Sequence, residues 1–578
     1  MKKYKILVWV VALFAYFQSC SVEPTYYSEV TPELFFDTQD KVYQRMGRAF
    51  THWAWYMADN QTHSNGRLLS EFTTDAMLVP SRWNDWFDGG RYLTLYQHTW
   101  TPAISEIWDG WRGFSMGIAQ ALSARDDIDM YVDFEGLRFP AGAREQIYNQ
   151  LNSLVAYFAL TGLDWFGGIP IYDSNNDPPK PRATDVETFQ YIEKLLLDAI
   201  PHLPKKTVLG AAETGAINQA AAALMLARLY FNAESYTRQN KYADAAKVSQ
   251  DIIDGVYGAY KLEDDWRSVF GYTNSRSTEI IWAVPSVHAV SERSVGTHSY
   301  HYSMGAYWDN GTVGSRNNGY SMTPSLDVDG KSYLWGSDDP SPKGPFRLGS
   351  PFAKFHEQDV RKQIHAFNPE IETHMYQGMF FFGDMINPVT GGRCMGGNRQ
   401  VPPTQLLTIV DQIARLIVTT DANYRSEGAR WADENSGVRL VKFSPVPWAS
   451  HQTLRGNPHI PVFRLAEVYY MLAECKLRAN DKAGAATLIN EVRKRYFVDA
   501  DPDPATADNL DEWRMLDEWL REFIGEGRRR TDLIRWNKFT TESWWDKPAT
   551  NKSHLNRFPI PERAINSNNL LEQNSGYE

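Results

Sequence analysis

The stretch IPVFRLAEVYYMLAE, at residues 460–474, decides the fold expected for this chain. From residue 463 onward its apolar side chains recur with the 3.6-residue period of a helix that turns one face to a core. The pattern continues to residue 479, so we predict a buried helix over 463–479. The positions predicted to face the core are Leu465, Val468, Leu472 and Cys475.

A second helix is predicted at 483–495, and the two helices together have the spacing of a tetratricopeptide unit. Small residues in such a unit allow two antiparallel helices to approach closely. The matching positions are Tyr469, Leu472, Ala473, Ala485, Ile489 and Val492. An earlier copy, which fits only after about six inserted residues, matches at Ala223, Leu226, Ala227, Tyr230, Ala245 and Ile252. A plain αα-hairpin packed through alanine is the alternative interpretation.

Helical patterns recur in two blocks that flank a section of different character. Before that section we predict helices at 40–60, 105–124, 144–160, 185–199, 218–231 and 242–254, and after it at 463–479, 483–495 and 510–536. The middle section, 266–456, is rich in Gly, Ser, Asn, Pro and aromatic residues and contains a strand-like run at 279–284. We therefore predict one mostly α-helical unit over 39–578. Its parts are an N-terminal helical part (39–265), a loop-rich insert with short strands (266–456) and a C-terminal helical part (457–578).

The N-terminus has the layout of an export signal. A basic start, an apolar run over 6–17 and a small-residue boundary come in that order. The apolar run is shorter than the roughly 20 residues that a membrane-spanning helix needs. Cys20 at the boundary has the position of a bacterial lipobox cysteine, so we predict removal of 1–19, lipid (palmitate) attachment at Cys20 and a tether over 20–38. Ordinary cleavage to a secreted protein is the alternative.

Composition excludes some classes of function. The 59 basic and 70 acidic residues give a net charge of −11, which repels nucleic acid, since phosphate contacts need basic side chains. The chain has three cysteines and no zinc-like Cys/His spacing, so we expect no metal or cofactor, and a buried thiol at Cys475 in place of a disulfide. Whether calcium is bound is left open.

Five motifs together resemble the SusD/RagB-type surface lipoproteins of the Bacteroidetes. They are the stretch 460–474, the run EFIGEGRRRTDLIRW at 522–536, the tail at 558–577, WFGGIP at 165–170 and EIIW at 279–282. Each is weak alone, but their order and joint presence are specific and extend over essentially the whole chain. The residues also have a plain structural reading. We expect ion pairs between helices from Glu526, Arg528, Arg530 and Asp532. Arg464 is expected to pair with Glu467 on one helix face. Arg521 and Glu526 are each expected to pair with side chains on neighbouring turns.

The resemblance implies a fold of tetratricopeptide-like helix pairs and a protein that binds without catalysing. Members of this kind sit lipid-anchored on the outer membrane at the cell surface. They capture a nutrient, most often an oligosaccharide, and pass it to a SusC-like TonB-dependent transporter. A peptide-binding member and a lid-only transporter subunit are the alternatives within the family.

Binding of a sugar needs flat aromatic platforms for its C–H face and polar side chains for its hydroxyls. Aromatic residues form 13% of the chain, and two clusters combine both properties. The first candidate cluster is Arg82, Trp83, Asn84, Asp85, Trp86 and Tyr92. The second is Tyr302, Tyr307, Trp308, Asp309, Asn310, Arg316, Asn317 and Asn318. A third aromatic run, 376–382, is expected to serve packing or a partner surface.

Three patterns are compatible with an enzyme, and none is convincing. The G-x-S-x-G match at 113–117 lies inside a helical pattern, whereas the hydrolase motif needs a strand-to-helix turn. The carboxylates of Asp85 and Asp88 could serve glycoside hydrolysis, but acidic pairs are frequent in this chain. His298 and His301 lack the glutamate base of a zinc protease. A secreted glycoside hydrolase is the less favoured alternative.

Overall fold

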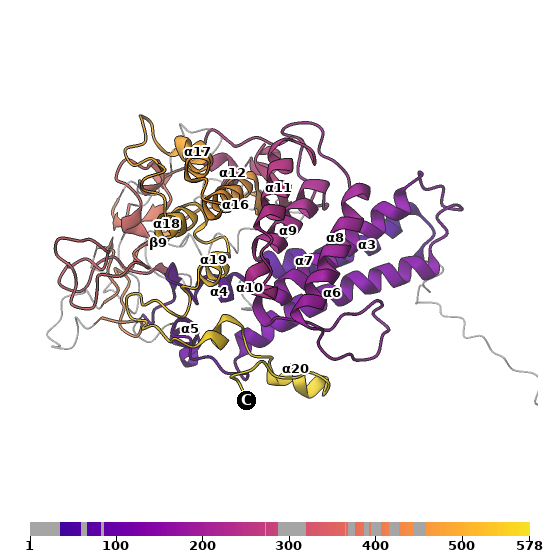
Figure 1. Ribbon diagram of the computed structural model, residues 1–578, viewed down its shortest axis with the longest axis horizontal. Helices are drawn as coiled ribbons and strands as arrows, with labels where there is room; N and C mark the ends of the chain where they lie inside the picture. Colours follow the sequence, from indigo (N-terminus) through magenta and orange to yellow (C-terminus); the bar gives the residue numbers. More distant parts are fainter. Residues whose placement is uncertain are drawn as a thin grey trace, which may run out of the picture.

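The computed structural model describes residues 35–58, 66–82, 86–271, 273–286, 320–363, 366–367, 376–386, 392–394, 406–414, 427–442 and 458–578. The predicted signal peptide and Cys20 lie outside these residues. Figure 1 shows the helices of both ends of the chain packed together, with the short strands of the insert at one side.

The N-terminal part is built from helices that pack as consecutive neighbours. They are α3 (Gln39–Ala58), α4 (Gly66–Glu71), α5 (Arg91–Tyr96), α6 (Ser105–Tyr131), α7 (Ala143–Phe166), α8 (Asp185–Ala199), α9 (Gln219–Phe231), α10 (Ala233–Thr237), α11 (Tyr242–Ile253) and α12 (Arg267–Phe270). All six predicted helices of this part are present, and several extend beyond the predicted ends.

The C-terminal part adds α16 (Leu465–Arg478), α17 (Lys482–Arg493), α18 (Glu512–Phe523), α19 (Arg529–Arg535) and α20 (Glu562–Ser567). Helix α9 packs against α11, α11 against α16, and α16 against α17, so the two predicted helix pairs form and stand side by side. Short 3-10 turns are η1 (Asp88–Gly90), η2 (Ile200–His202), η3 (Asn274–Arg276), η4 (Phe352–Lys354), η5 (Val360–Lys362), η7 (Lys494–Tyr496) and η8 (Ser553–Asn556).

Side-chain caps fix where several helices begin. Helix α8 starts with a capping box, in which the Thr184 hydroxyl accepts from the Glu187 N–H and the Glu187 carboxylate accepts from the Thr184 N–H. Asn218 caps α9 and Asp481 caps α17 in the simpler one-sided form. Each cap satisfies one of the backbone donors that a helix leaves unpaired at its first turn.

Two predicted helix boundaries in the C-terminal part are wrong. Phe463 and Arg464 belong to strand β10 (Ile460–Arg464), which pairs antiparallel with β2 (Ile280–Val284), so α16 begins only at Leu465. The predicted helix 510–536 is broken between α18 and α19. Gly525 and Gly527 there have φ of 78° and 79°, a left-handed conformation that a right-handed helix cannot contain.

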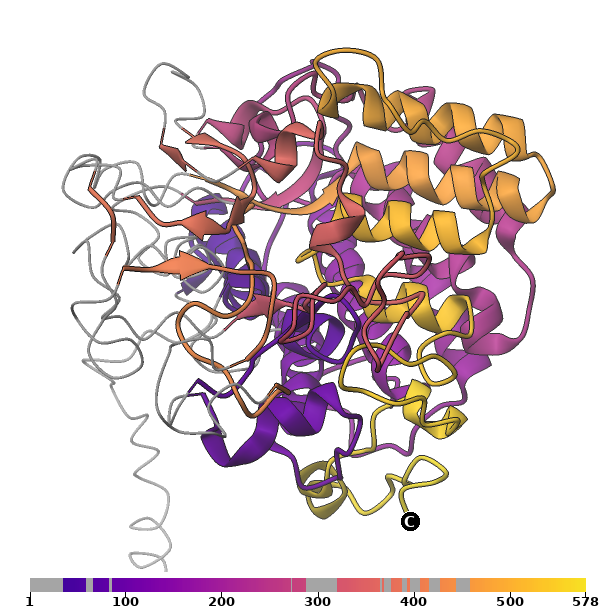
Figure 2. The ribbon, with the colours of Figure 1, turned by 90° about the vertical axis from the view of Figure 1, so that its left-hand side faces the viewer.

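The insert forms two-stranded antiparallel ladders. They pair β1 (Met77–Leu78) with β3 (Ser321–Met322), β4 (Ala366–Phe367) with β5 (Tyr376–Gln377), β6 (Phe380–Phe381) with β9 (Arg439–Leu440), and β7 (Gly383–Asp384) with β8 (Thr408–Ile409). Figure 2 shows them at the left, beside the stacked helices of the C-terminal part. Phe380 and Phe381 are buried, as expected for a packing role. The division of the chain into three parts stays a prediction.

One large hydrophobic core connects both helical parts and part of the insert, and a smaller separate cluster in the insert includes Phe381, Cys394 and Val441. The indole rings of Trp53 in α3 and Trp282 in β2 stack with centroids 4.1 Å apart, and Phe463 of β10 contacts Trp282. Cys394 and Cys475 are buried free thiols, which confirms the prediction for Cys475. Burial raises the pKa of Cys394 to about 11 and that of Cys475 to about 12.

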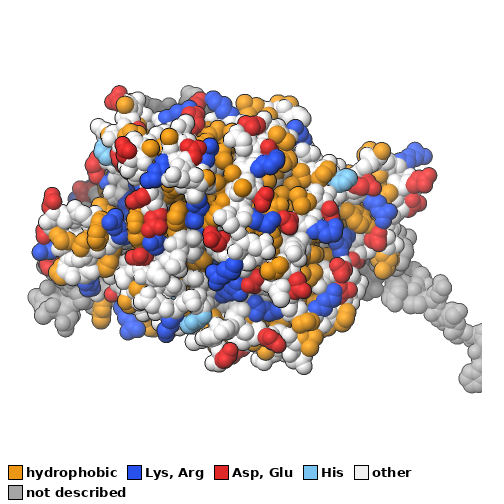
Figure 3. All heavy atoms as spheres, in the orientation of Figure 1, with side chains coloured by type: hydrophobic (Ala, Val, Ile, Leu, Met, Phe, Trp, Pro, Cys, Tyr) orange, Lys and Arg blue, Asp and Glu red, His pale blue; other side chains and the backbone are white. Residues whose placement is uncertain are grey.

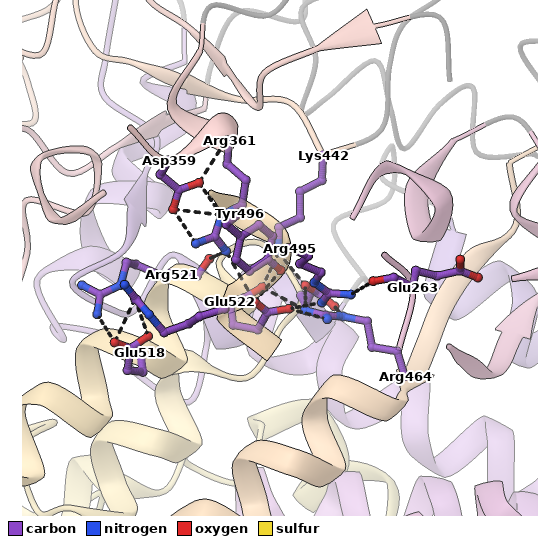
Figure 4. A network of polar contacts seen from close by, with 12 residues as sticks. Glu263, Asp359, Arg361, Lys442, Arg464, Arg495, Tyr496, Glu518, Arg521 and Glu522 are labelled. Carbon is purple, nitrogen blue, oxygen red and sulfur yellow. Dashed lines mark hydrogen bonds and ion pairs between the residues drawn. The ribbon is translucent and has the colours of Figure 1, made fainter. Parts of the chain in front are cut away.

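A buried lattice of ion pairs joins the last helices to β10 and the insert (Figure 4). Glu522 of α18 accepts hydrogen bonds from Arg464 at 2.6 Å, Arg495 at 3.0 Å and the Tyr496 hydroxyl at 2.6 Å. Glu526 pairs with Arg464 at 2.8 Å and with Lys442 at 2.5 Å. Although burial opposes ionisation, the surrounding cations hold the pKa of the Glu522 carboxyl well below its usual range. The lattice therefore stays charged at neutral pH.

Three of the four residues of the predicted lattice form ion pairs, but only Arg528 pairs across two helices, since the partners of Asp532 lie on its own helix and those of Glu526 in β10 and the insert. Arg528 pairs with Glu467 at 2.7 Å and with Asp532 at 3.1 Å, and Glu526 is placed as described. Arg530 instead donates to the backbone carbonyl of Asn556 at 2.7 Å.

Of the two further pairings expected within this region, that of Arg464 with Glu467 is wrong, whereas Arg521 does pair with a neighbouring turn. Arg464 and Glu467 do not pair, because the strand-to-helix boundary between them sends Arg464 to Glu522 and Glu526, and Glu467 to Arg228 at 2.6 Å. Arg521 pairs with Glu518 at 2.5 Å, on its own helix.

The G-x-S-x-G match at 113–117 lies in the middle of α6, as the helical pattern predicts. Both glycines are packing positions. A Cβ at Gly113 would lie 2.2 Å from the Tyr56 ring, and one at Gly117 would lie 2.3 Å from the Phe158 ring. The Ser115 hydroxyl donates to the Arg112 carbonyl of the same helix. The motif therefore serves helix packing, and the exposed serine of a hydrolase turn is not formed.

Candidate functional site

The first candidate cluster lies where the chain leaves β1 and enters α5. Ser81 donates its N–H to the Ala429 carbonyl at 2.8 Å, and Ala432 donates to the Ser81 carbonyl at 3.1 Å. This pairing seats the segment 79–82 against 429–432. Figure 1 shows α5 below α4, at the junction of the N-terminal helices with the insert.

Arg82 forms the floor of this region. It has no exposed surface, and its guanidinium donates to the Ser436 carbonyl at 2.9 Å, to the Ser321 hydroxyl at 2.5 Å and to the Asp433 carbonyl. Its role as a ligand contact is therefore wrong for this structure. A buried guanidinium with these partners fixes the loop 433–436 against β3.

Tyr92 is also buried, with 2% of its surface exposed, so it too cannot touch a ligand here. Its hydroxyl accepts from Arg91 at 3.1 Å, and burial raises its pKa to about 12. The ring instead supports Trp86, with centroids 6.3 Å apart. The same indole lies 6.0 Å from the ring of Tyr320.

The backbone that carries Trp86 is unusual. Trp86 has φ of 64° and Asp88 of 43°, and Gly89 and Gly90 follow at 70° and 83°. Side chains other than glycine rarely adopt positive φ, and such conformations persist only where the surroundings enforce them. Asp88 is held by an ion pair with Arg91 at 3.0 Å. This turn leaves the Phe87 ring 48% exposed, whereas the Trp86 ring is half-buried and packs against the core.

A further exposed aromatic side chain lies on the segment that pairs with the start of this cluster. Trp431 is 40% exposed and lies on the segment that pairs with Ser81 and Arg82. Sequence reasoning missed it, because Trp431 and Trp86 are far apart along the chain. Its only sequence signal is a tryptophan in a Gly- and Asn-containing loop. We call Trp86, Phe87 and Trp431 the aromatic surface.

The remaining predicted positions cannot be placed. Trp83, Asn84 and Asp85, and the second candidate cluster of Tyr302, Tyr307, Trp308, Asp309, Asn310, Arg316, Asn317 and Asn318, lie outside the described residues. So do His298 and His301. Tyr320, the first described residue after the second cluster, contacts Trp86.

The side chains of this surface can bind a ligand by stacking and hydrogen bonding. Exposed and half-buried rings can stack on an apolar face, and peptide and side-chain groups around them can donate and accept hydrogen bonds. Among the described residues, no group of three or more His, Cys, Asp or Glu side chains is arranged to hold a metal ion. None of the helices in the described ranges is both long and apolar enough to cross a membrane.

Comparison with known proteins gives consistent matches. The model of the SusD family matches residues 278–577. Starch-binding protein SusD of Bacteroides thetaiotaomicron is 29% identical over 437 residues, which cover 72% of this chain and 70% of that protein. These matches cover the C-terminal motifs on which the predicted resemblance rests.

Solved structures share the fold. Surface glycan-binding protein A from Bacteroides fluxus matches with a TM-score of 0.61 and 19% identity, over 93% of this chain and 100% of that one. The protein of that name from Bacteroides thetaiotaomicron, in complex with laminarihexaose, matches with a TM-score of 0.60 and 17% identity, over 93% and 99%. The predicted fold class, mostly α with tetratricopeptide-like helix pairs and a loop-rich insert, is confirmed. On the evidence of its sequence and its fold, the chain belongs to the SusD family.

Proposed function

We propose that this protein binds oligosaccharides at the cell surface and passes them, unaltered, to a SusC-like TonB-dependent transporter. Membership of the SusD family is the observation that carries the proposal. The relative named as a starch-binding protein and the related structure in complex with laminarihexaose support a glycan as the ligand. The lipid anchor at Cys20 and the position in the outer membrane are part of the same proposal.

The aromatic surface is the proposed platform for the sugar. Stacking buries about 60 Å² of one ring face, which contributes ~1.5 kcal/mol at ~25 cal/mol/Å². Millimolar affinity needs about 4 kcal/mol, so two or three rings have to act together with hydrogen bonds. Trp86, Phe87 and Trp431 supply such a set, and we propose that Trp83, Asn84 and Asp85 complete it. The second predicted cluster stays a prediction.

Weak binding suits this task, because a carrier has to release its cargo. The mechanism is capture and release, with no covalent step.

The test is the affinity of the purified protein for maltoheptaose and laminarihexaose, measured by isothermal titration calorimetry. Changing Trp86 or Trp431 to Ala removes one platform each and is expected to weaken binding about tenfold. Tyr43→Ala is the matched control, because Tyr43 is 42% exposed on α3, in the helical part. Unchanged affinity in folded Trp86 and Trp431 variants would exclude this surface as the binding site.

Two other measurements separate the alternatives. Incubation with the same glycans is expected to release no new reducing ends, whereas a glycoside hydrolase would release them. A titration that stays flat with glycans but responds to peptides would favour a peptide-binding member of the family. A flat titration with both would favour a lid-only subunit.

A further inference from the structure

A cavity of about 150 Å³ lies where the ends of α3, α7 and α9 meet β10 and α19. It is separate from the aromatic surface and shares no residue with it. Helices α4, α10 and α19, which border it, lie together near the centre of Figure 1. A cavity of comparable volume is large enough to admit a six-membered ring.

The walls of this cavity combine aromatic and polar side chains. Tyr56, Tyr157, Trp165 and Phe463 provide apolar surface, and the Arg228 guanidinium lies 4.4 Å from the Phe463 ring centroid. Pockets for small molecules have this character, mostly apolar with a few convergent polar groups. An apolar cavity of this size would be dry, but this one has the polar partners that a hydroxyl needs.

Tyr56 is one of the buried polar groups that the described part of the fold leaves without a hydrogen-bond partner, and it lines the cavity. Its side chain is 2% exposed, and within the part of the chain that the structure describes its hydroxyl has no hydrogen-bond partner. Its ring packs over Gly113 of α6, a task that phenylalanine would perform equally well. An unpaired buried hydroxyl destabilises a fold, and at Tyr56, which lines the cavity, a bound molecule can supply the missing partner.

Hydrogen bonds hold the charged side chains around the cavity in place, but these side chains can still form further hydrogen bonds. Arg228 forms two hydrogen bonds to Glu467, through Nε and Nη2, whereas a guanidinium has five N–H donors. Asp164 accepts from the Tyr236 hydroxyl at 2.8 Å and from the Thr531 hydroxyl at 2.9 Å, one bond on each oxygen. Each carboxylate oxygen accepts about two bonds, so Asp164 can accept more.

The cavity therefore offers donors at Arg228, acceptors at Asp164 and a hydroxyl that can do both at Tyr56. The lining includes three carboxylates, Asp164, Glu467 and Glu526, and two guanidinium groups, Arg228 and Arg528. Because the negative and positive side chains nearly cancel, the cavity does not attract an anion. A neutral molecule with several hydroxyl groups can bond to both the donors and the acceptors. Burial raises the pKa of Tyr56, which keeps its hydroxyl protonated and able to donate.

A route to the cavity is also present. A groove lined by residues of α8, α10 and α19 and of the C-terminal tail borders it, and the two share Asp164, Tyr236 and Thr531. Figure 3 shows that on this face acidic and basic side chains are interspersed, without a large area of one sign. A neutral ligand meets no electrostatic barrier there.

We propose that this cavity is a second binding site, which takes one small neutral polyhydroxylated molecule of monosaccharide size, with Tyr56, Asp164 and Arg228 as its hydrogen-bonding residues. The site does not depend on the function proposed for the aromatic surface.

The probes are the free hexoses glucose, galactose and mannose, titrated into the protein by calorimetry and followed by thermal shift. At least one hexose is expected to bind saturably and to raise the melting temperature, since a ligand of the native state stabilises it. Tyr56→Phe is expected to weaken that binding about fivefold, because it deletes the hydroxyl and keeps the ring. Asp164→Asn is expected to weaken it as well.

Tyr96→Phe is the matched control, since Tyr96 is a buried tyrosine on α5 that packs against Trp545, outside the cavity. Trp86→Ala separates the two sites, because it should weaken oligosaccharide binding and leave hexose binding unchanged. The proposal is overturned if none of the hexoses binds, or if Tyr56→Phe binds the hexose as tightly as the unchanged protein. Either result leaves the proposal for the aromatic surface standing.

Discussion

At the scale of single residues, the buried ion pairs determine how this molecule responds to substitution. Glu522 is surrounded by Arg464, Arg495 and Arg361, and the Tyr496 hydroxyl donates to it. Replacing a whole buried network with apolar residues is often neutral, but removing one partner leaves the other charges without compensation. The lattice is thus sensitive to single changes.

Glu522→Gln is expected to lower the free energy of unfolding by about 3 kcal/mol, because it leaves three buried guanidinium groups short of a charge. Urea unfolding followed by tryptophan fluorescence measures the loss. Lys247→Ala is the control, since Lys247 forms an exposed pair with Asp251 on α11 and should change stability by less than about 0.5 kcal/mol. Equal shifts for the two variants would contradict the argument.

The pH dependence of stability can be predicted from Glu474, which is buried beside Arg535 and Arg478 and accepts from the Trp519 indole at 2.7 Å. Burial alone would raise its pKa, but the two guanidinium groups and the hydrogen bonds lower the pKa to about 2, from an ordinary value of 4.5. A depressed folded pKa gives stability that is present above the unfolded pKa and is lost as the pH falls through the folded one. The loss from this residue alone is about 3 kcal/mol.

Glu474→Gln should therefore show a flatter dependence of unfolding free energy on pH between about 5 and 2. The measurement is urea unfolding at a series of pH values, and the slope is compared, since the variant is less stable throughout. Parallel curves for the variant and the unchanged protein would show that Glu474 is not a source of acid sensitivity.

Residue-level pairing was the least predictable part of the fold. The sequence indicated ion pairs among the last helices, but a spacing of three residues does not identify partners when a strand ends between them. Arg464 and Glu467 illustrate this, since each finds its carboxylate or guanidinium on a distant segment.

At the scale of elements, α6 shows why helix packing here depends on glycine. Tyr56 of α3 and Phe158 of α7 lie directly over Gly113 and Gly117, closer than any side chain would allow. The two glycines lie one turn apart on the face toward α3 and α7. Close contact of the three helices thus requires glycines inside α6, and each glycine lowers the intrinsic stability of that helix.

Gly117→Ala is expected to destabilise the protein by about 1–3 kcal/mol, because its Cβ would lie 2.3 Å from the Phe158 ring. Gly47→Ala on α3 is the matched control. Its Cβ would meet nothing within 4 Å, so it should stabilise by about 0.5–1 kcal/mol through helix propensity. Thermal unfolding followed by circular dichroism distinguishes the two, and the same sign for both would be inconsistent with this packing.

The helices themselves were predictable because long amphipathic patterns are strong signals. The exception was the region of α18 and α19, where a continuous apolar pattern hid a break. Gly525 and Gly527 in left-handed conformations end one helix and allow the next to begin in a new direction. Such a break depends on tertiary contacts, including that of the Gly527 N–H with Glu71 at 2.7 Å.

At the scale of the whole molecule, contacts between distant parts of the chain are numerous. Arg529 of α19 donates to Asp75, 454 positions earlier, at 2.7 Å and 2.8 Å. The Asn574 side chain donates to the carbonyls of Phe166 and Phe558, and Trp100 donates to the Tyr577 hydroxyl. The C-terminal tail is therefore held in place by hydrogen bonds to the N-terminal part of the chain.

The chain from residue 39 to residue 578 is expected to unfold in a single cooperative transition, because one large core connects both helical parts and part of the insert. Differential scanning calorimetry tests this, with the van't Hoff enthalpy equal to the calorimetric enthalpy. Two resolved transitions would show that the insert or one helical part folds on its own.

The same long-range contacts explain why the site was predicted only in part. Trp86 was in the predicted cluster, but Arg82 and Tyr92 are buried. Local sequence does not show which side chains of a loop face the solvent and which face the core. Trp431 could not be assigned, because its neighbours Ser81 and Arg82 reach it only through the fold. Arg82 itself bonds to a residue 351 positions away.

The two thiols enclosed at Cys394 and Cys475 have a practical consequence for any cell that exports this chain. Neither is joined in a disulfide, so assembly of the described regions waits for no oxidase or isomerase and should proceed alike in reducing and oxidising surroundings. Once enclosed, both stay in the protonated form, which is the unreactive one toward peroxide and electrophiles. Oxidants that reach the protein therefore meet no reactive thiolate at these two positions.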